Sequence, residues 1–245
     1  MTAHTATFRI LAISSGLSTP SSTRMLADQM TRETAAALGA DGTQVEVSTV
    51  ELREYAHDLT DALLTRFPSE RLAMVIEQVR AADAIVAVTP IFNVGPAGLF
   101  KMFVDVFDTA LWADKPVLLG ATAGTARHSL AIDYALRPMF GYLKADLVPT
   151  SVFAASADFG ADTEHQADAQ PLAVRVRRAA AELATMLRVR RGIAAGAGAA
   201  TDGMTAAEEA APAPDAEDVA ESSARPALDP EFSDFVPMGQ LLRRG

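Results

Sequence analysis

Three short polar stretches, each following an apolar run, hold the residues of this chain whose types and spacing can do chemistry. The first is rich in hydroxyl groups, the second joins an aromatic ring to a carboxamide, and the third is built from small residues. They run Ser15-Gly16-Leu17-Ser18-Thr19-Pro20-Ser21-Ser22-Thr23, Pro90-Ile91-Phe92-Asn93 and Ala121-Thr122-Ala123-Gly124-Thr125. Each leaves the carboxyl end of a predicted strand, where ligands of open parallel sheets bind. We therefore expect one shared ligand site.

The first stretch has the composition of an anion-binding turn. Its hydroxyls lie between a predicted strand and a predicted helix, where free amides and the helix dipole also attract negative charge. Helix capping alone requires only one Ser or Thr. The additional hydroxyls therefore favour a phosphate-binding site over a simple helix cap. Neither the Gly-Lys-Ser/Thr of a Walker loop nor the further glycines of a Rossmann fingerprint are present. The candidate phosphate ligands are Ser15, Ser18, Ser21, Ser22 and Thr23.

The second and third stretches suit a planar heterocycle with donors and acceptors on its edge. Phe92 supplies a flat ring and Asn93 a carboxamide, while Gly124 and its small neighbours let a ring lie against the backbone. Ordinary tight turns are the alternative for both stretches. The candidate ring-binding residues are Pro90, Ile91, Phe92, Asn93, Ala121, Thr122, Ala123, Gly124 and Thr125.

Two further candidate site residues follow the third stretch after Ala126. The guanidinium of Arg127 can pair with a negatively charged second substrate. His128 lies beside it. A solvated surface charge is the alternative interpretation of Arg127.

Composition excludes several classes of protein. The net charge is −10 over 245 residues, and no basic stripe is present, so we do not expect nucleic acid as a partner. Cysteine is absent, which removes disulfides and thiolate chemistry, and the four histidines show no paired ligand spacing. No apolar run reaches the ~18 residues of a membrane span, so we expect a cytoplasmic protein without membrane contact.

The hydrophobic pattern predicts strands that alternate with helices. Strands are expected at 8–13, 44–50, 84–88, 116–119 and 147–153, and helices from about residue 21, around 72–79, at 96–111, at 128–143 and from 172 to 187; the pattern over 51–67 is ambiguous. Such alternation predicts an α/β fold with helices on both faces of a five-stranded parallel sheet in the order 2-1-3-4-5.

The composition changes near residue 194. Residues 195–228 are rich in Ala, Gly, Pro and acidic side chains and are too poor in large apolar residues to repay the entropy of ordering. Large apolar residues return in 229–245, which we interpret as a short docking segment or as a functionless terminus. The predicted organisation is a domain at 1–194, a disordered linker at 195–228 and a C-terminal segment at 229–245.

These motifs resemble the NADPH-dependent FMN reductase family of the flavodoxin-like superfold. The family opening Gly-Ser-x-Arg-x-x-Ser-x-Asn is matched loosely at 15–23, where Ser18 stands in place of Arg, and Thr-Pro-x-Tyr-Asn is similar to Thr89-Pro90-Ile91-Phe92-Asn93. The most specific likeness is to reductases of two-component alkanesulfonate and luciferase-like monooxygenase systems. Their third loop and downstream His-x-x-Ala-x-Asp-Tyr-Ala-Leu-x-Pro resemble residues 121–125 and 128–138.

The resemblance implies a flavodoxin-like three-layer sandwich that binds FMN and takes a hydride from NADPH or NADH to flavin N5. In such a transfer the protein orients and the flavin reacts, so no catalytic residue and no metal are assigned. The resemblance further implies a homodimer or tetramer and delivery of reduced FMN to a partner flavin-dependent monooxygenase. Met102, Phe103 and Phe107 suit either a subunit contact or a buried helix face.

Two alternative functions stay open at this point. A quinone or azo reductase would keep FMN as a fixed prosthetic group. A flavodoxin-like electron carrier would have no turnover of its own and would usually shield the ring with aromatic residues, which the third stretch lacks.

Overall fold

The central strands are short aliphatic runs whose two faces are both buried, which is typical of a parallel sheet covered by helices on each side. The computed structural model describes residues 7–40, 42–159 and 170–192. β1 (Thr7–Ser14) lies between β2 (Gln44–Glu51) and β3 (Ala84–Phe92), and β3 also pairs with β5 (Pro116–Ala123). Beyond β5 lie β6 (Asp146–Leu147) and β7 (Val152–Ala155), both parallel to it.

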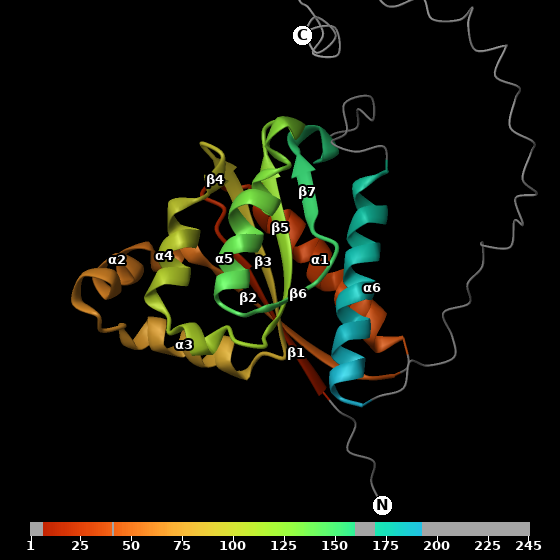
Figure 1. The fold of residues 1–245 in the computed structure, drawn as a ribbon, viewed down its shortest axis with the longest axis horizontal. Coiled ribbons are helices and arrows are strands. Elements are labelled where there is room, and N and C mark those ends of the chain that lie inside the picture. Colours follow the sequence, from red (N-terminus) through yellow and green to blue (C-terminus); the bar gives the residue numbers. More distant parts are fainter. Residues whose placement is uncertain (1–6, 41, 160–169, 193–245) are drawn as a thin grey trace, which may run out of the picture. The chain divides into compact units, whose positions relative to one another are not determined.

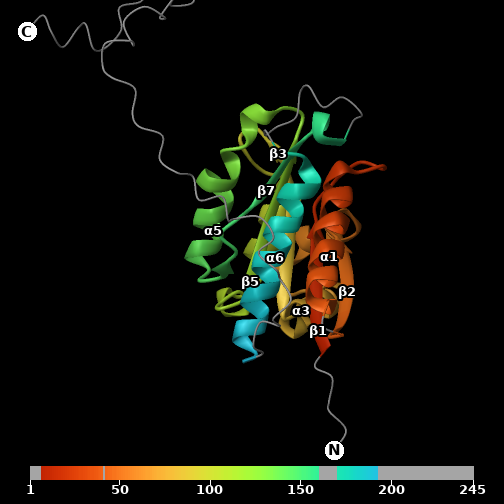
Figure 2. The same cartoon turned by 90° about the vertical axis from the view of Figure 1, so that its right-hand side faces the viewer.

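Helices cover both faces of this sheet and give three layers (Figures 1 and 2). On one face α1 (Ser22–Gly39) and α6 (Leu172–Arg190) pack against Ile10, Val86 and Leu118. On the other face lie α2 (Ala56–Thr65), α3 (Glu70–Ala81), α4 (Gly98–Val106) and α5 (Arg137–Tyr142), over Leu11, Ile85 and Leu119. Alternate residues of each strand therefore enter two separate cores, as the period of a strand requires. The α/β class and the parallel sheet are confirmed.

The predicted count of five strands in the order 2-1-3-4-5 was wrong. The sheet has seven strands in the order β2-β1-β3-β5-β6, with β4 paired to β3 and β7 paired to β5. β4 (Gly95–Pro96) arises because the chain reverses after Phe92 and runs antiparallel to the end of β3. The predicted strand at 147–153 is divided into β6 and β7 around Pro149, which has no N–H for the ladder.

Two predicted helices also differ from the structure. The helix expected at 96–111 ends at Val106, and a 3-10 turn follows at Thr109–Leu111 because the Asp108 carboxylate accepts the Ala110 amide at 2.8 Å. The helix expected at 128–143 is a 3-10 turn at Ala126–His128, a π-helix at Ile132–Leu136 and then α5. Pro138 at the start of α5 removes a helical donor and crowds the preceding turn, which favours wider winding there.

The ambiguous stretch at 51–67 forms a 3-10 turn, η1 (Leu52–Tyr55), followed by α2. Phe103 and Phe107 belong to the core beneath α4, where they contact Trp112, and Met102 is partly buried against the same core. Of the two alternatives, a subunit contact and a buried helix face, the buried helix face is therefore the one that describes Phe103 and Phe107.

Part of the predicted organisation lies outside the described residues. The linker predicted at 195–228 and the segment at 229–245 fall there entirely. Within the described ranges, no helix is long and apolar enough to cross a membrane. Nor does that part of the chain contain a cluster of His, Asp and Glu that could hold a metal ion.

Candidate functional site

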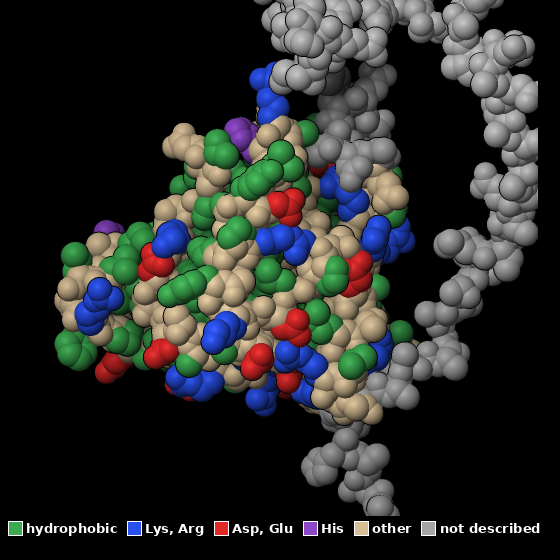
Figure 3. Space-filling model, viewed as in Figure 1, with side chains coloured by type: hydrophobic (Ala, Val, Ile, Leu, Met, Phe, Trp, Pro, Cys, Tyr) green, Lys and Arg blue, Asp and Glu red, His purple; other side chains and the backbone are tan. Residues whose placement is uncertain are grey.

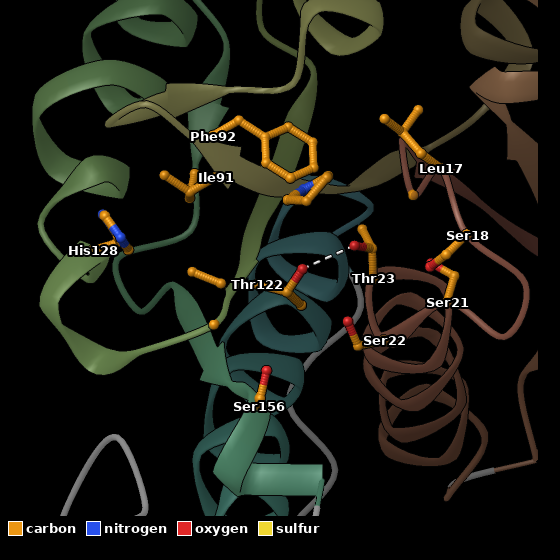
Figure 4. A pocket seen from close by; sticks show the side chains of 14 residues that line it. Leu17, Ser18, Ser21, Ser22, Thr23, Ile91, Phe92, Thr122, His128 and Ser156 are labelled. Atoms are coloured by element: carbon orange, nitrogen blue, oxygen red, sulfur yellow. Dashed lines mark hydrogen bonds between the residues drawn. The ribbon is translucent and has the colours of Figure 1, made fainter.

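A pocket of about 350 Å³ lies at the carboxyl ends of β1, β3 and β5, where the three stretches meet (Figure 4). This is the edge at which doubly wound sheets bind ligands, and the volume falls in the usual range of about 300–1,000 Å³ for small-molecule pockets. The lining residues are Gly16, Leu17, Ser18, Ser21, Ser22, Thr23, Pro90, Ile91, Phe92, Thr122, Ala123, Gly124, His128 and Ser156.

The turn between β1 and α1 forms the polar end of the pocket. Ser21 is the N-cap of α1, and its Oγ accepts the Arg24 amide at 3.2 Å. The Ser18 hydroxyl donates to the Pro20 carbonyl at 2.9 Å and closes the turn on itself. A Cβ at Gly16 would lie 2.0 Å from Ser21 Oγ, so only glycine lets the turn fold this tightly against the helix start.

The beginning of α1 leaves donors available to a ligand. The Ser22 hydroxyl and the backbone amides of Ser22 and Thr23 have no partner among the described residues, as expected for the first turn of a helix. Thr23 Oγ1 lies 2.8 Å from Thr122 Oγ1, and this buried hydrogen bond joins α1 to β5 (Figure 4). The bond fixes the polar end of the pocket relative to the third stretch.

The second stretch is a strand end and a hairpin rather than the loop that the sequence predicts. Pro90, Ile91 and Phe92 belong to β3, and the chain turns at Asn93 and Val94, which have φ values of 50° and 67°. Positive φ at both central residues is the geometry of a two-residue hairpin turn, and it is unusual for β-branched Val94. Ile91 and Phe92 form an apolar wall across the pocket from Ser21 (Figure 4), and 49% of Phe92 is exposed.

The third stretch is also partly strand, since β5 continues to Ala123. Thr122, Ala123 and Gly124 line the pocket, and His128 lies on the 3-10 turn that follows. The small side chains leave the backbone open to a flat ligand on this side.

Five of the predicted site residues do not line the pocket. Ser15 is buried below it, with its hydroxyl 3.5 Å from the Val88 carbonyl, and Ala121 is buried in the core. Asn93 is exposed at the tip of the hairpin. Thr125, at the end of the third stretch, and Arg127, on the 3-10 turn that follows, are exposed and do not line the pocket.

Sequence reasoning did not select Gly16, Leu17 or Ser156, which do line the pocket. Gly16 and Leu17 lie inside the first stretch but carry no hydroxyl. Ser156 directly follows β7, so the rule that drew attention to the other strand ends also applies to it.

The chemistry of the lining fits a phosphate ester that carries a flat ring. One end offers hydroxyls, free amides and the positive end of the dipole of α1, an 18-residue helix. The other end is apolar and planar. Among the described lining residues there is no Lys or Arg, so a phosphate here would be held by neutral donors together with the helix.

An open parallel α/β sandwich with such a pocket defines a flavodoxin-like nucleotide-binding protein. The chain belongs to the NADPH-dependent FMN reductase family, whose model matches residues 8–160. This confirms the predicted resemblance, the NAD(P)H:FMN oxidoreductase class, and FMN with a nicotinamide nucleotide as the molecules involved.

Similar proteins support the assignment. An FMN reductase (NADPH) of Pseudomonas aeruginosa is 32% identical over 182 residues, which cover 74% of this chain and 94% of that protein. The NADH-dependent FMN reductase SfnE of Pseudomonas putida is 34% identical, with 70% of this chain and 88% of that protein covered. A solved oxidoreductase of Corynebacterium diphtheriae is 44% identical, with a TM-score of 0.69 and 75% and 98% of the two chains covered.

Proposed function

We propose that the pocket holds FMN and that NADPH or NADH approaches its open side. The observation that carries this proposal is the division of the pocket into a donor-rich end at α1 and a flat apolar end at β3. Ser18, Ser21, Ser22 and Thr23 would hold the phosphate. When bound, FMN would supply the redox chemistry, namely acceptance of a hydride equivalent from the nicotinamide.

The remaining lining residues orient the ring and exclude water. Pro90, Ile91 and Phe92 would flank it on the β3 side, and Thr122, Ala123 and Gly124 on the β5 side. Such positioning is the contribution that a protein makes to hydride transfer between two cofactors. We therefore assign no side chain of the pocket as an acid or a base.

Arg127 and His128 are the proposed contacts for the nicotinamide nucleotide. Arg127 is exposed on the turn beside Gly124 and has no hydrogen bond or ion pair with another described residue. A free guanidinium at the rim can form paired hydrogen bonds with a phosphate of the incoming nucleotide.

Self-association as a homodimer or tetramer is also proposed. Tyr134 and Tyr142 are 78% and 80% exposed on the π-helix and α5, and Leu130, just before the π-helix, is 59% exposed. Figure 3 shows apolar side chains among charged ones on this side of the molecule. Exposed aromatic residues of this kind are enriched where proteins meet.

Delivery of reduced FMN to a partner monooxygenase, and a cytoplasmic location, rest on the sequence alone.

The test is the steady-state oxidation of NADPH and NADH by purified protein after gel filtration, with and without added FMN. We expect saturable turnover that requires free FMN. Tightly bound yellow flavin whose turnover requires a quinone would instead indicate the prosthetic-group alternative. Absence of turnover with any acceptor would favour an electron carrier.

A further inference from the structure

An arginine from a distant part of the chain contacts the turn between β1 and α1, which is the turn proposed to hold the phosphate. Arg53 lies on η1, directly after β2. Its Nη1 donates to the Ser18 carbonyl at 3.4 Å and to the Thr19 hydroxyl. The turn between β1 and α1 thus has an anchor outside its own sequence, although Arg53 does not line the pocket.

Glu51 holds this arginine in place together with a second one. Arg53 Nε lies 3.0 Å from Glu51 Oε2, and Arg24 Nη1 lies 2.6 Å from Glu51 Oε1. The Glu51 side chain is only 17% exposed, and those of Arg53 and Arg24 are about one third exposed. Partial burial reduces screening by salt, so these ion pairs hold the two arginines more firmly than fully exposed pairs would.

The two arginines lie at the end of α1 where a cation is normally unfavourable. Arg24 is in the first turn, next to the positive end of the helix dipole, and this turn contains no acidic residue. A hydrogen bond to Asp28 raises the pKa of Arg24 above its ordinary value, so the side chain stays charged. Arg24 and Arg53 pair with Glu51 and Asp28, so this network has no net charge, and its contribution next to the pocket is to hold the turn in place.

We propose that Arg53 is a positioning residue that fixes the phosphate-binding turn and thereby sets the affinity for the phosphate of FMN. The inference rests on the proposed binding of FMN in this pocket. Arg53 holds the Ser18 carbonyl and the Thr19 hydroxyl without lining the pocket, so that the Ser18 and Ser21 hydroxyls keep their places at the polar end.

The test compares FMN with riboflavin, which has the same ring but no phosphate. Binding of each to the full chain is followed by quenching of flavin fluorescence for the wild type, Arg53→Gln and Arg53→Lys. We expect Arg53→Gln to weaken FMN about tenfold, which is the scale of a lost hydrogen bond to a charged group. Riboflavin affinity should stay unchanged, and Arg53→Lys should recover part of the loss.

Two further variants complete the experiment. Thr19→Val removes one acceptor of Arg53 from an exposed position, so it provides the test if Arg53→Gln does not fold, and it should weaken FMN selectively as well. Arg80→Gln makes the same change in an exposed ion pair with Glu77 on α3, and it should leave FMN affinity unchanged.

The outcomes separate this inference from the proposed function. Unchanged FMN affinity in Arg53→Gln, or equal losses for FMN and riboflavin, would overturn the role of Arg53 while FMN binding by the wild type still stands. A wild-type chain that binds neither flavin would overturn both.

Discussion

Single hydroxyl groups of the first stretch have different tasks, although the sequence presents them as alike. Ser21 caps α1, Ser18 closes the turn, and Ser15 is tied to β3 below the pocket. Ser22 keeps its hydroxyl available to a ligand. The polar end of the pocket therefore depends on a few hydroxyls with fixed directions rather than on their total number.

Ser21→Asp tests the placement of the phosphate. Aspartate caps helices as well as serine does, so we expect the variant to fold with unchanged stability. Its carboxylate would repel the phosphate of FMN, and we expect affinity to fall at least about tenfold, because like charges a few ångströms apart cost on the order of 1 kcal/mol or more. The measurement is a fluorescence titration with FMN.

Ser21→Asn is the matched control for that change. Asparagine also caps the helix and has nearly the size of aspartate but no charge, so the loss of affinity should be much smaller. Equal affinity for FMN in the two variants would show that the phosphate does not lie at this helix start.

At the scale of elements, α6 is fastened to the end of β7 by a buried ion pair. Arg175 Nη2 lies 2.5 Å from Asp158 Oδ1, and the Asp158 side chain has no exposure. Asp158 Oδ2 accepts the Ala155 amide at 2.8 Å, and Arg175 donates to the carbonyls of Phe153 and Gln170. This network holds the turn that places Ser156 at the pocket.

Asp158→Asn should destabilise the fold strongly. It leaves the buried guanidinium of Arg175 without its counter-charge, and breaking a buried pair in this way costs about 3–5 kcal/mol. The free energy of unfolding from urea titration measures the loss. Asp105→Asn is the control, because its pair with Lys101 is exposed and such pairs contribute only about 0.3–0.5 kcal/mol. Similar losses in both variants would contradict the structural role of Asp158.

A second link joins α6 to the turn before β7 and makes stability depend on pH. Burial opposes ionisation of Glu182, but hydrogen bonds from the Thr150 hydroxyl at 2.6 Å and amide at 2.8 Å hold its pKa below its ordinary value. A carboxyl group with a lowered pKa in the folded state stabilises the fold above its unfolded pKa, and this stability disappears as pH falls through the folded value.

Thr150→Val should therefore reduce stability at pH 7, and its deficit relative to the wild type should shrink between about pH 5 and pH 3, near the ordinary pKa of Glu. Urea unfolding at several pH values follows this difference. Thr185→Val removes a hydroxyl that bonds only the Ala181 carbonyl on α6, so its effect should not vary with pH. A constant deficit for Thr150→Val would refute the link to Glu182.

At the scale of the whole molecule, every described element and every pocket residue lies before residue 193. We predict that a chain ending at residue 194 retains the fold and the site. Its melting temperature should agree with that of the full chain within about 2 °C, which corresponds to less than roughly 1 kcal/mol for a domain of this size. FMN affinity should also be unchanged. A large fall in either quantity would assign residues 195–245 a part in the domain.

The sequence by itself determined the fold class, the alternation of strands and helices and the three stretches that meet at the pocket. These features follow from local properties: the period of hydrophobic residues, the hydroxyls before α1 and the small residues after β5. Local pattern also has limits, as Pro149 and the turn at Asn93 show. Pro149 and this turn change the number of strands, but the hydrophobic pattern from which the strands are predicted is the same with or without them.

Only the tertiary structure decided which side chains line the pocket. Ser15 and Ser18 are both serines of one stretch, but packing of β1 on β3 buries the former and leaves the latter at the pocket. Arg53 and Ser156 gain their positions from contacts between segments that are distant in the sequence. Such contacts depend on how whole elements pack, and no local pattern of residue types records that distance or direction.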